Sequence, residues 1–214
     1  LTHATEAYTS NFANDYTDGI ALQTIKLVFE WLEKSVKTAD PEAREKMHNA
    51  STMAGMAFAN AFLGMSHSMA HKIGGVHHTV HGRTNAILLP YVIRYNGTRP
   101  SKTTTWPKYN YWKADEKFQD IAKMLGLPHS TPEEAVEAYA KAVYDLGEAV
   151  GITMNFKGFG IDEKVWKDSL HEIALLAYED QCSPANPRLP MVADMEEIMA
   201  DAYYGYGERP GRRK

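Results

Sequence analysis

The chain has 214 residues, of which 44% are hydrophobic and 23% are charged, a balance typical of a globular domain that buries a sizeable core. Its formal net charge of -4 argues against nucleic-acid binding through bulk positive charge, and no apolar stretch of about eighteen residues predicts a membrane span. The single cysteine, Cys182, excludes an internal disulfide framework and predicts a reducing, cytoplasmic location.

Helical signals dominate the first third of the sequence. Residues 3–13 are predicted to be helical, and because this pattern starts directly after Leu1 without a signal region, we expect a piece of a longer chain. Residues 18–37 carry a wide apolar stripe at helical spacing. Asp40, followed by a proline, predicts the start of a third helix over 41–63.

The rest of the chain continues in the same way, and alternating strand patterns are nearly absent. The expected segments are a helix over 83–95 interrupted at Pro90, a long loop over 96–113, and helices ending near 150, 178 and 203. The predicted fold class is therefore all-α, a helical bundle-like domain of about eight or nine helices over 1–206. A basic tail over 207–214 is predicted to be disordered.

Histidines are concentrated in one part of the sequence. Five of the nine fall within fifteen residues: His67, His71, His77, His78 and His81. His67 and His71 are four residues apart, so on a helix they share one face. We expect Gly74 and Gly75 to break that helix and let the chain fold back, bringing His81 to the same point. Because neutral imidazole is a common ligand of transition metals, the run predicts a metal site.

The residue types around these histidines argue against two common kinds of metal site, a metalloprotease motif and a structural zinc site. A metalloprotease motif would place a glutamate directly after the first histidine of the pair, where this chain has Ser68. A structural zinc site would usually recruit several cysteines, and Cys182 is alone. A site of nitrogen and oxygen donors suits ferrous iron, zinc, manganese or cobalt. His3, by itself on a predicted helix, is more typical of a structural or exposed histidine.

Several longer segments resemble a known family. LTHATEAY, GMAFANAFLGMSHSMAHKIGG and HGRTNAILLPYVIRYN are similar to the C-terminal, metal-binding helical domain of the iron-containing alcohol dehydrogenases. STPEEAVEA, DQCSPANPRLP and the later AYYG resemble the alcohol dehydrogenase portion of bifunctional aldehyde–alcohol dehydrogenases. The resemblance covers essentially the whole chain and implies a domain that lacks its N-terminal α/β nucleotide-binding domain.

The resemblance also implies a metal centre. In the family, Fe²⁺, or Zn²⁺ in its place, is held by an aspartate and three histidines, and the histidines match His3, His67 and His81. The aspartate would lie four residues before His3, ahead of Leu1, so these residues offer three of the four ligands. The glycine-rich turn that binds the nucleotide is likewise missing from the sequence.

Three further positions match residues of the family's active site. His71 corresponds to a histidine near the nicotinamide and the substrate, where it acts either as a proton relay or as a group that shapes the pocket. Phe58 and Cys182 match positions that line the substrate pocket. His77 and His78 match no ligand and are interpreted as loop residues.

The implied function is interconversion of a primary alcohol, such as ethanol, with its aldehyde by hydride transfer to and from NAD(H). The implied partners are the alcohol or aldehyde, the missing nucleotide-binding domain, and further copies in a homo-oligomer or filament, while this fragment alone is expected to be inactive. Two other hypotheses stay open. One is a helical metal-dependent hydrolase, for which Glu6 is the only nearby acid on the His3 helix; the other is a non-enzymatic self-assembly module.

Overall fold

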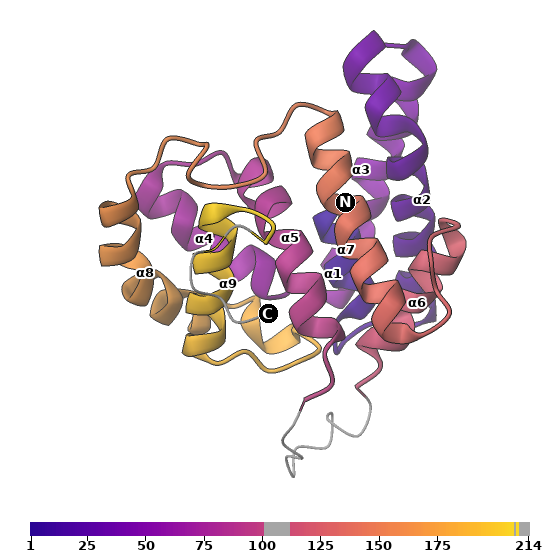
Figure 1. Ribbon diagram of the computed structural model, residues 1–214. Helices are drawn as coiled ribbons and strands as arrows, with labels where there is room; N and C mark the ends of the chain where they lie inside the picture. Colours follow the sequence, from indigo (N-terminus) through magenta and orange to yellow (C-terminus); the bar gives the residue numbers. More distant parts are fainter. Residues whose placement is uncertain (101–111, 208, 210–214) are drawn as a thin grey trace.

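The computed structural model describes residues 1–100, 112–207 and 209. Within these ranges the chain forms nine α-helices, a short 3₁₀ helix and no strand, which confirms the all-α prediction (Figure 1). The elements are α1 (Thr2–Thr9), α2 (Asp15–Thr38), α3 (Pro41–Ala61), α4 (Met65–His77), α5 (His81–Gly97), α6 (Ala114–Met124), α7 (Pro132–Ala149), α8 (Glu163–Tyr178), η2 (Ser183–Ala185) and α9 (Val192–Tyr204). None of the helices in the described ranges is both long enough and apolar enough to cross a bilayer.

Four helices begin at a polar residue whose side chain accepts hydrogen bonds from the first free backbone N–H groups. These residues are Asn14, Asp40, Thr131 and Asp162. At the start of α2 the bonding is reciprocal, because the Thr17 hydroxyl also accepts from the Asn14 backbone N–H. This capping box starts α2 at Asp15, three residues before the predicted position.

The central element is α5, which packs into two separate cores. Leu88 and Val92 pack into a core formed with α4, α8 and α9. Leu89 and Ile93, one residue further along each turn, pack into a second core formed with α1, α2, α3, α6 and α7. In Figure 1, α4, α8 and α9 accordingly lie on one side of α5, and α2, α3, α6 and α7 on the other. The middle of α5 is thereby held between the two halves of the domain.

The prediction that Gly74 and Gly75 break the histidine helix is wrong, because α4 continues through both to His77. A glycine inside a helix costs about 1 kcal/mol relative to alanine. In α4 this cost is offset by burial of Met69 and Ile73 in the core with α8 and α9. The chain turns instead at His78, which adopts a left-handed conformation with φ of 54°.

Pro90 does not interrupt its helix either. α5 runs unbroken from His81 to Gly97 with Pro90 buried inside it, so packing on both sides outweighs the loss of one backbone hydrogen bond.

Two elements were not predicted, α6 and η2. The residue before α6, Lys113, makes no capping hydrogen bond with its side chain, so the usual start signal is missing there.

Two predictions fall mostly on residues that the structure does not describe. The predicted loop over 96–113 includes 101–111, which lie outside the described residues, and its first part belongs to α5. In the predicted tail, 208 and 210–214 also lie outside them. The described Arg209 donates a hydrogen bond from Nη1 to Asp201 Oδ1 at 3.1 Å.

The contact between α5 and α7 yields a test of this packing. A Cβ added to Gly97 would lie 2.4 Å from Cγ2 of Val136 in α7, whereas one added to Gly55 in α3 would meet no atom within 4 Å. We expect Gly97→Ala to lower the free energy of unfolding by about 1–3 kcal/mol through overpacking. Gly55→Ala, the matched control, should raise it by about 0.5–1 kcal/mol. Urea unfolding of both variants measures the difference, and a Gly97→Ala protein as stable as Gly55→Ala would contradict the packing.

Candidate metal centre

Three imidazoles from three different helices meet at one place. His3 lies on α1, His67 on α4 and His81 at the first position of α5. One ring nitrogen from each lies within 4.8 Å of the others. The ring centroids of His3 and His67 are 4.5 Å apart, and those of His67 and His81 are 5.3 Å apart. Three imidazole nitrogens gathered at one place are a donor set that divalent metal ions use in proteins.

The surroundings of two of these rings, His3 and His81, favour the uncharged form. Burial, and after it the neighbouring His67, lower the pKa of His3 to about 4. Partial desolvation, and then His67 and His71, also lower the pKa of His81. Neutral imidazole is the form that binds metal ions, so these pKa shifts favour cation binding by His3 and His81.

A buried carboxylate fixes the orientation of the central imidazole. Glu6 and His67 are only 3% and 1% exposed, and Oε2 of Glu6 lies 2.5 Å from Nδ1 of His67. An ionised carboxylate only accepts hydrogen bonds, so Nδ1 is the protonated nitrogen and Nε2 carries the lone pair. Nε2 is buried and has no hydrogen-bond partner. An unpaired buried acceptor among three imidazoles fits a bound divalent cation, with the carboxylate behind it in the arrangement common at such sites.

The same carboxylate holds the start of α4. Gly64, the residue before the helix, has no side chain to cap it. Glu6 Oε1 instead accepts from the backbone N–H of Ser66 at 2.7 Å, and Asn186 Oδ1 accepts from that of Met65 at 3.1 Å. A Cβ at Gly64 would come within 2.6 Å of Asn186 Oδ1 and 3.0 Å of Glu6 Oε1. The glycine is therefore required for the close approach of both capping side chains.

His81 is linked to the same helix start through one amide. Asn85, one turn further along α5, donates from Nδ2 to Nε2 of His81 at 3.3 Å. Its Oδ1 accepts a hydrogen bond from Oγ of Ser66 at 3.0 Å. Ser66 thus bonds to Glu6 through its backbone and to Asn85 through its hydroxyl, which connects the surroundings of His67 with those of His81.

The other predicted site residues border the three imidazoles. The ring of Phe58 stacks on His3, with centroids 4.7 Å apart and planes 21° apart. The ring of His71 lies parallel to that of His81, 5.4 Å away. Cys182 is 7% exposed, and its sulfur lies within 4.8 Å of potential ligand atoms of His71 and Asp180. The structure therefore brings all six predicted site residues together, while their individual roles stay predictions.

The two remaining histidines of the run lie elsewhere. His77, the last residue of α4, faces α8: its Nε2 is 3.0 Å from Ser169 Oγ and its ring stacks on Trp166. His78 follows the helix in an exposed position. His77 is thus helical where a loop residue was expected, and neither histidine belongs to the group formed by His3, His67 and His81.

Several residues of the centre were missed by sequence reasoning. Glu6 was considered only as the base of a hydrolase, but both of its oxygens are occupied by Ser66 and His67. Its position three residues after His3, on the same side of a helix, was the available signal. Asn186 and Asp180 come from segments far along the chain, and no local pattern marked them.

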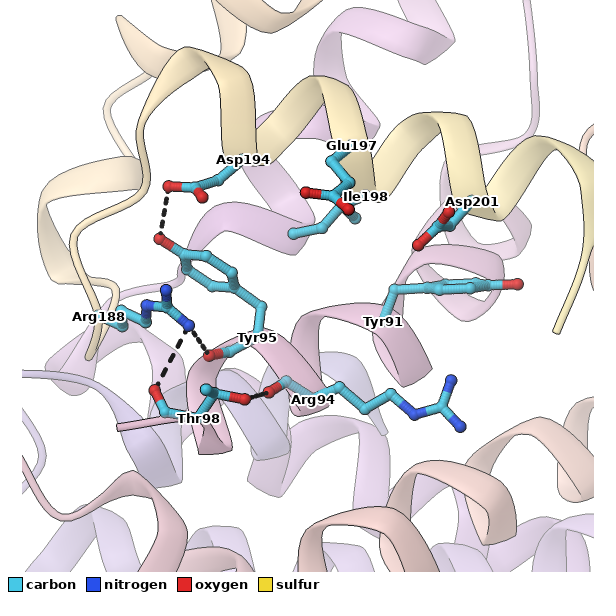
Figure 2. A pocket seen from close by; sticks show the side chains of 9 residues that line it. All are labelled: Tyr91, Arg94, Tyr95, Thr98, Arg188, Asp194, Glu197, Ile198 and Asp201. Atoms are coloured by element: carbon cyan, nitrogen blue, oxygen red, sulfur yellow. Dashed lines mark hydrogen bonds between the residues drawn. The ribbon is translucent and has the colours of Figure 1, made fainter. Parts of the chain in front are cut away.

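A separate hollow of about 250 Å³ lies between α5 and α9, lined by Tyr91, Arg94, Tyr95, Thr98, Arg188, Asp194, Glu197, Ile198 and Asp201 (Figure 2). Its two cationic side chains are already engaged by the protein. Arg188 donates to the carbonyls of Tyr95 and Thr98, and Arg94 is paired with Glu137. None of the six predicted site residues lines it, so the histidine centre is the candidate functional site.

Comparisons with known proteins identify the family to which this chain is similar. A family described as "Fe-containing alcohol dehydrogenase family, C-terminal" matches residues 1–203. The chain is 78% identical, over all 214 residues, to an aldehyde-alcohol dehydrogenase of Streptococcus pneumoniae, and spans 24% of that protein. It is 42% identical over 205 residues to an NADPH-dependent butanol dehydrogenase of Clostridium saccharobutylicum, covering 96% of this chain and 49% of that protein.

A solved structure shows the same fold. An alcohol dehydrogenase from Oenococcus oeni superimposes with a TM-score of 0.82 and 32% identity, over 94% of this chain and 49% of that one. The chain thus spans between about a quarter and a half of the length of these relatives. The family resemblance inferred from the histidine segments is confirmed.

The convergence of the imidazoles predicts which histidines retain metal. We expect His67→Ala and His81→Ala to abolish retention of Fe²⁺ or Zn²⁺, because each removes one of three nitrogens that meet at one point. His77→Ala is the matched control, since this ring faces Ser169 and Trp166 instead. Elemental analysis after gel filtration measures the metal content. Equal content in all three variants would refute the ligand assignment.

The thiol of Cys182 yields a second test. Burial, together with the nearby charge of Asp180, raises the pKa of Cys182 to about 12. At pH 8 only about one thiol in 10⁴ is then the reactive thiolate, so iodoacetamide should leave the native chain unlabelled and label it fully in urea. Because the chain has one cysteine, the mass increase reports this site alone. Stoichiometric labelling of the native chain within minutes would contradict the described burial.

Proposed function

This chain belongs to the Fe-containing alcohol dehydrogenase family, of which it carries the C-terminal domain, and from that premise we propose that it forms the metal-binding wall of an alcohol dehydrogenase active site. The reaction proposed for the whole protein is interconversion of a primary alcohol, such as ethanol, and its aldehyde with NAD(H). The observation that carries the proposal is the unpaired, buried Nε2 of His67 at the meeting point of His3 and His81.

The donor set indicates which cation the centre would hold. His3, His67 and His81 would supply three nitrogens, which suit Fe²⁺, the metal in the family's description, and accept Zn²⁺ as well. When bound, such a cation supplies Lewis acidity toward the oxygen of the alcohol or aldehyde. When bound, NAD(H) supplies the hydride acceptor or donor.

The residues of this chain orient the reactants and limit the access of water. The Glu6 carboxylate keeps the lone pair of His67 directed at the centre, because it holds the opposite ring nitrogen at 2.5 Å. The Phe58 ring stacks on His3, and the buried Cys182 lies beside His71, so both supply apolar surface next to the centre. His71 is 34% exposed and adjoins His81, a position from which it can exchange a proton with substrate or water.

The hydrolase hypothesis has no support in this geometry. A hydrolase using the same histidines needs a carboxylate free to activate water, and Glu6, 3% exposed, already accepts hydrogen bonds at both oxygens.

Self-association and docking of a nucleotide-binding domain belong to the proposed function, since the chain spans only part of the relatives' length. No observation on the described residues supports self-assembly as the sole function. The cytoplasmic location stays a prediction.

The proposal is tested with the full-length protein that carries this chain, loaded with Fe²⁺ and followed by NADH formation from ethanol. We expect His67→Ala to lower turnover by more than about 100-fold, since loss of even an outer contact costs 10–100-fold at such sites. His77→Ala should stay within about twofold of the unchanged protein, because its ring contacts α8. The chain of residues 1–214 alone should show negligible turnover. Full turnover by His67→Ala, or ester hydrolysis without nucleotide, would overturn the proposal.

A further inference from the structure

A second polar cluster adjoins the histidine centre and is organised around Asp180, which follows α8. The Asp180 side chain is buried, 6% exposed, and its oxygens face three donors. Oδ2 lies 2.9 Å from Nζ of Lys72 and 3.2 Å from Nδ1 of His71, and Oδ1 accepts from the backbone N–H of Cys182 at 3.0 Å. A buried carboxylate is tolerated only with such donors, so these contacts are required.

This cluster is better suited to orient His71 than to bind a second cation. His71, Asp180 and Cys182 do place one potential ligand atom each within 4.8 Å. However, the ammonium group of Lys72 already neutralises Asp180, and the pKa of the Cys182 thiol is raised to about 12, so the sulfur keeps its proton. A cation at this cluster would have to displace the ammonium group of Lys72 from Asp180 and remove the proton of the Cys182 thiol.

The contact with Asp180 determines which nitrogen of His71 carries hydrogen. Burial alone would raise the pKa of Asp180, but hydrogen bonds from Lys72, Cys182 and His71 outweigh it and hold that pKa below its usual range. An ionised carboxylate can only accept a hydrogen bond from Nδ1. The neutral ring therefore has its proton on Nδ1 and its lone pair on Nε2, across the ring from Asp180.

We propose that Asp180 is the positioning residue of His71, fixing the Nδ1–H tautomer so that Nε2 takes the proton of the substrate hydroxyl. During oxidation the O–H bond of the alcohol breaks, its proton binds Nε2, and the electron pair remains on oxygen. Water then takes that proton, and His71 returns to its neutral form. The identity of the substrate rests on the proposed function, whereas the tautomer does not. The proposal makes His71 a proton relay in place of a residue that only shapes the pocket.

The tautomer can be measured without metal, nucleotide or substrate. NMR of the ¹⁵N-histidine-labelled chain identifies the protonated ring nitrogen of His71 from long-range N–H couplings, with His71→Gln to assign the signal. We expect Nδ1–H in the unchanged chain and in Glu179→Ala, an exposed neighbouring acid. Asp180→Ala should shift the ring toward Nε2–H. An Nε2–H tautomer of His71 in the unchanged chain overturns the proposal, even if the Asp180→Ala chain does not fold. If that chain folds and its His71 keeps the Nδ1–H tautomer, the proposal is likewise overturned.

A double-mutant cycle in the full-length protein tests the consequence. We expect His71→Ala to lower kcat about 100-fold and Asp180→Ala about tenfold, with KM within about twofold in both. If Asp180 acts through His71, the double variant is no slower than His71→Ala. Losses that multiply would show that Asp180 acts independently, for example through the Cys182 segment, and would overturn the proposal. Absence of dehydrogenase activity in the unchanged protein would refute the proposed function. The NMR measurement of the His71 tautomer would still test whether Asp180 positions His71.

Discussion

The arrangement of the histidines depends on one buried carboxylate. Glu6, on α1, directs one oxygen to the Ser66 backbone N–H at the start of α4 and the other to Nδ1 of His67. Away from water, such a charge is stable only when its oxygens accept hydrogen bonds, so α1 and α4 are held in one relative position. His3 and His67, one from each helix, therefore stay at a fixed separation. The negative charge also lies where the positive end of the α4 dipole favours it.

The helical scaffold extends this local constraint to the other residues of the centre. The middle of α5 is buried in both cores, and this packing holds the helix whose first residue is His81. Side chains carried on packed helices hold their geometry better than side chains on loops. The centre thus combines rigid placement with a hydrogen bond from His67 to Glu6 that sets the orientation of the His67 ring.

How much of this was predictable differs between the fold and the site. The all-α class and the approximate span of most helices follow from apolar spacing and from start signals such as Asp40 and Thr131, which the structure confirms as caps. The breaks expected at Gly74 and Pro90 did not occur, because burial of α4 and α5 outweighs local propensity. α6 was missed because its start lacks a capping side chain.

For the site, the clustered histidines and the family resemblance were sufficient to name the residues that converge, including the distant His3. They did not identify the carboxylates behind the rings. Glu6 was a local residue assigned to a different chemistry, and Asp180 is 109 positions from His71, a separation at which only the folded chain reveals contact. Hydrogen-bond partners that orient a ligand leave no periodic signal in the sequence, since any donor or acceptor from any element can serve.

The most direct test of the central claim is an anomalous-difference map from crystals of the chain grown with Fe²⁺ or Zn²⁺. We expect one peak within about 2.0–2.3 Å of ring nitrogens from residues 3, 67 and 81, with Nε2 as the ligand atom of His67 and Glu6 on its Nδ1. A peak at His77 or at the Asp180 cluster, with the three imidazoles left unbound, would contradict the account.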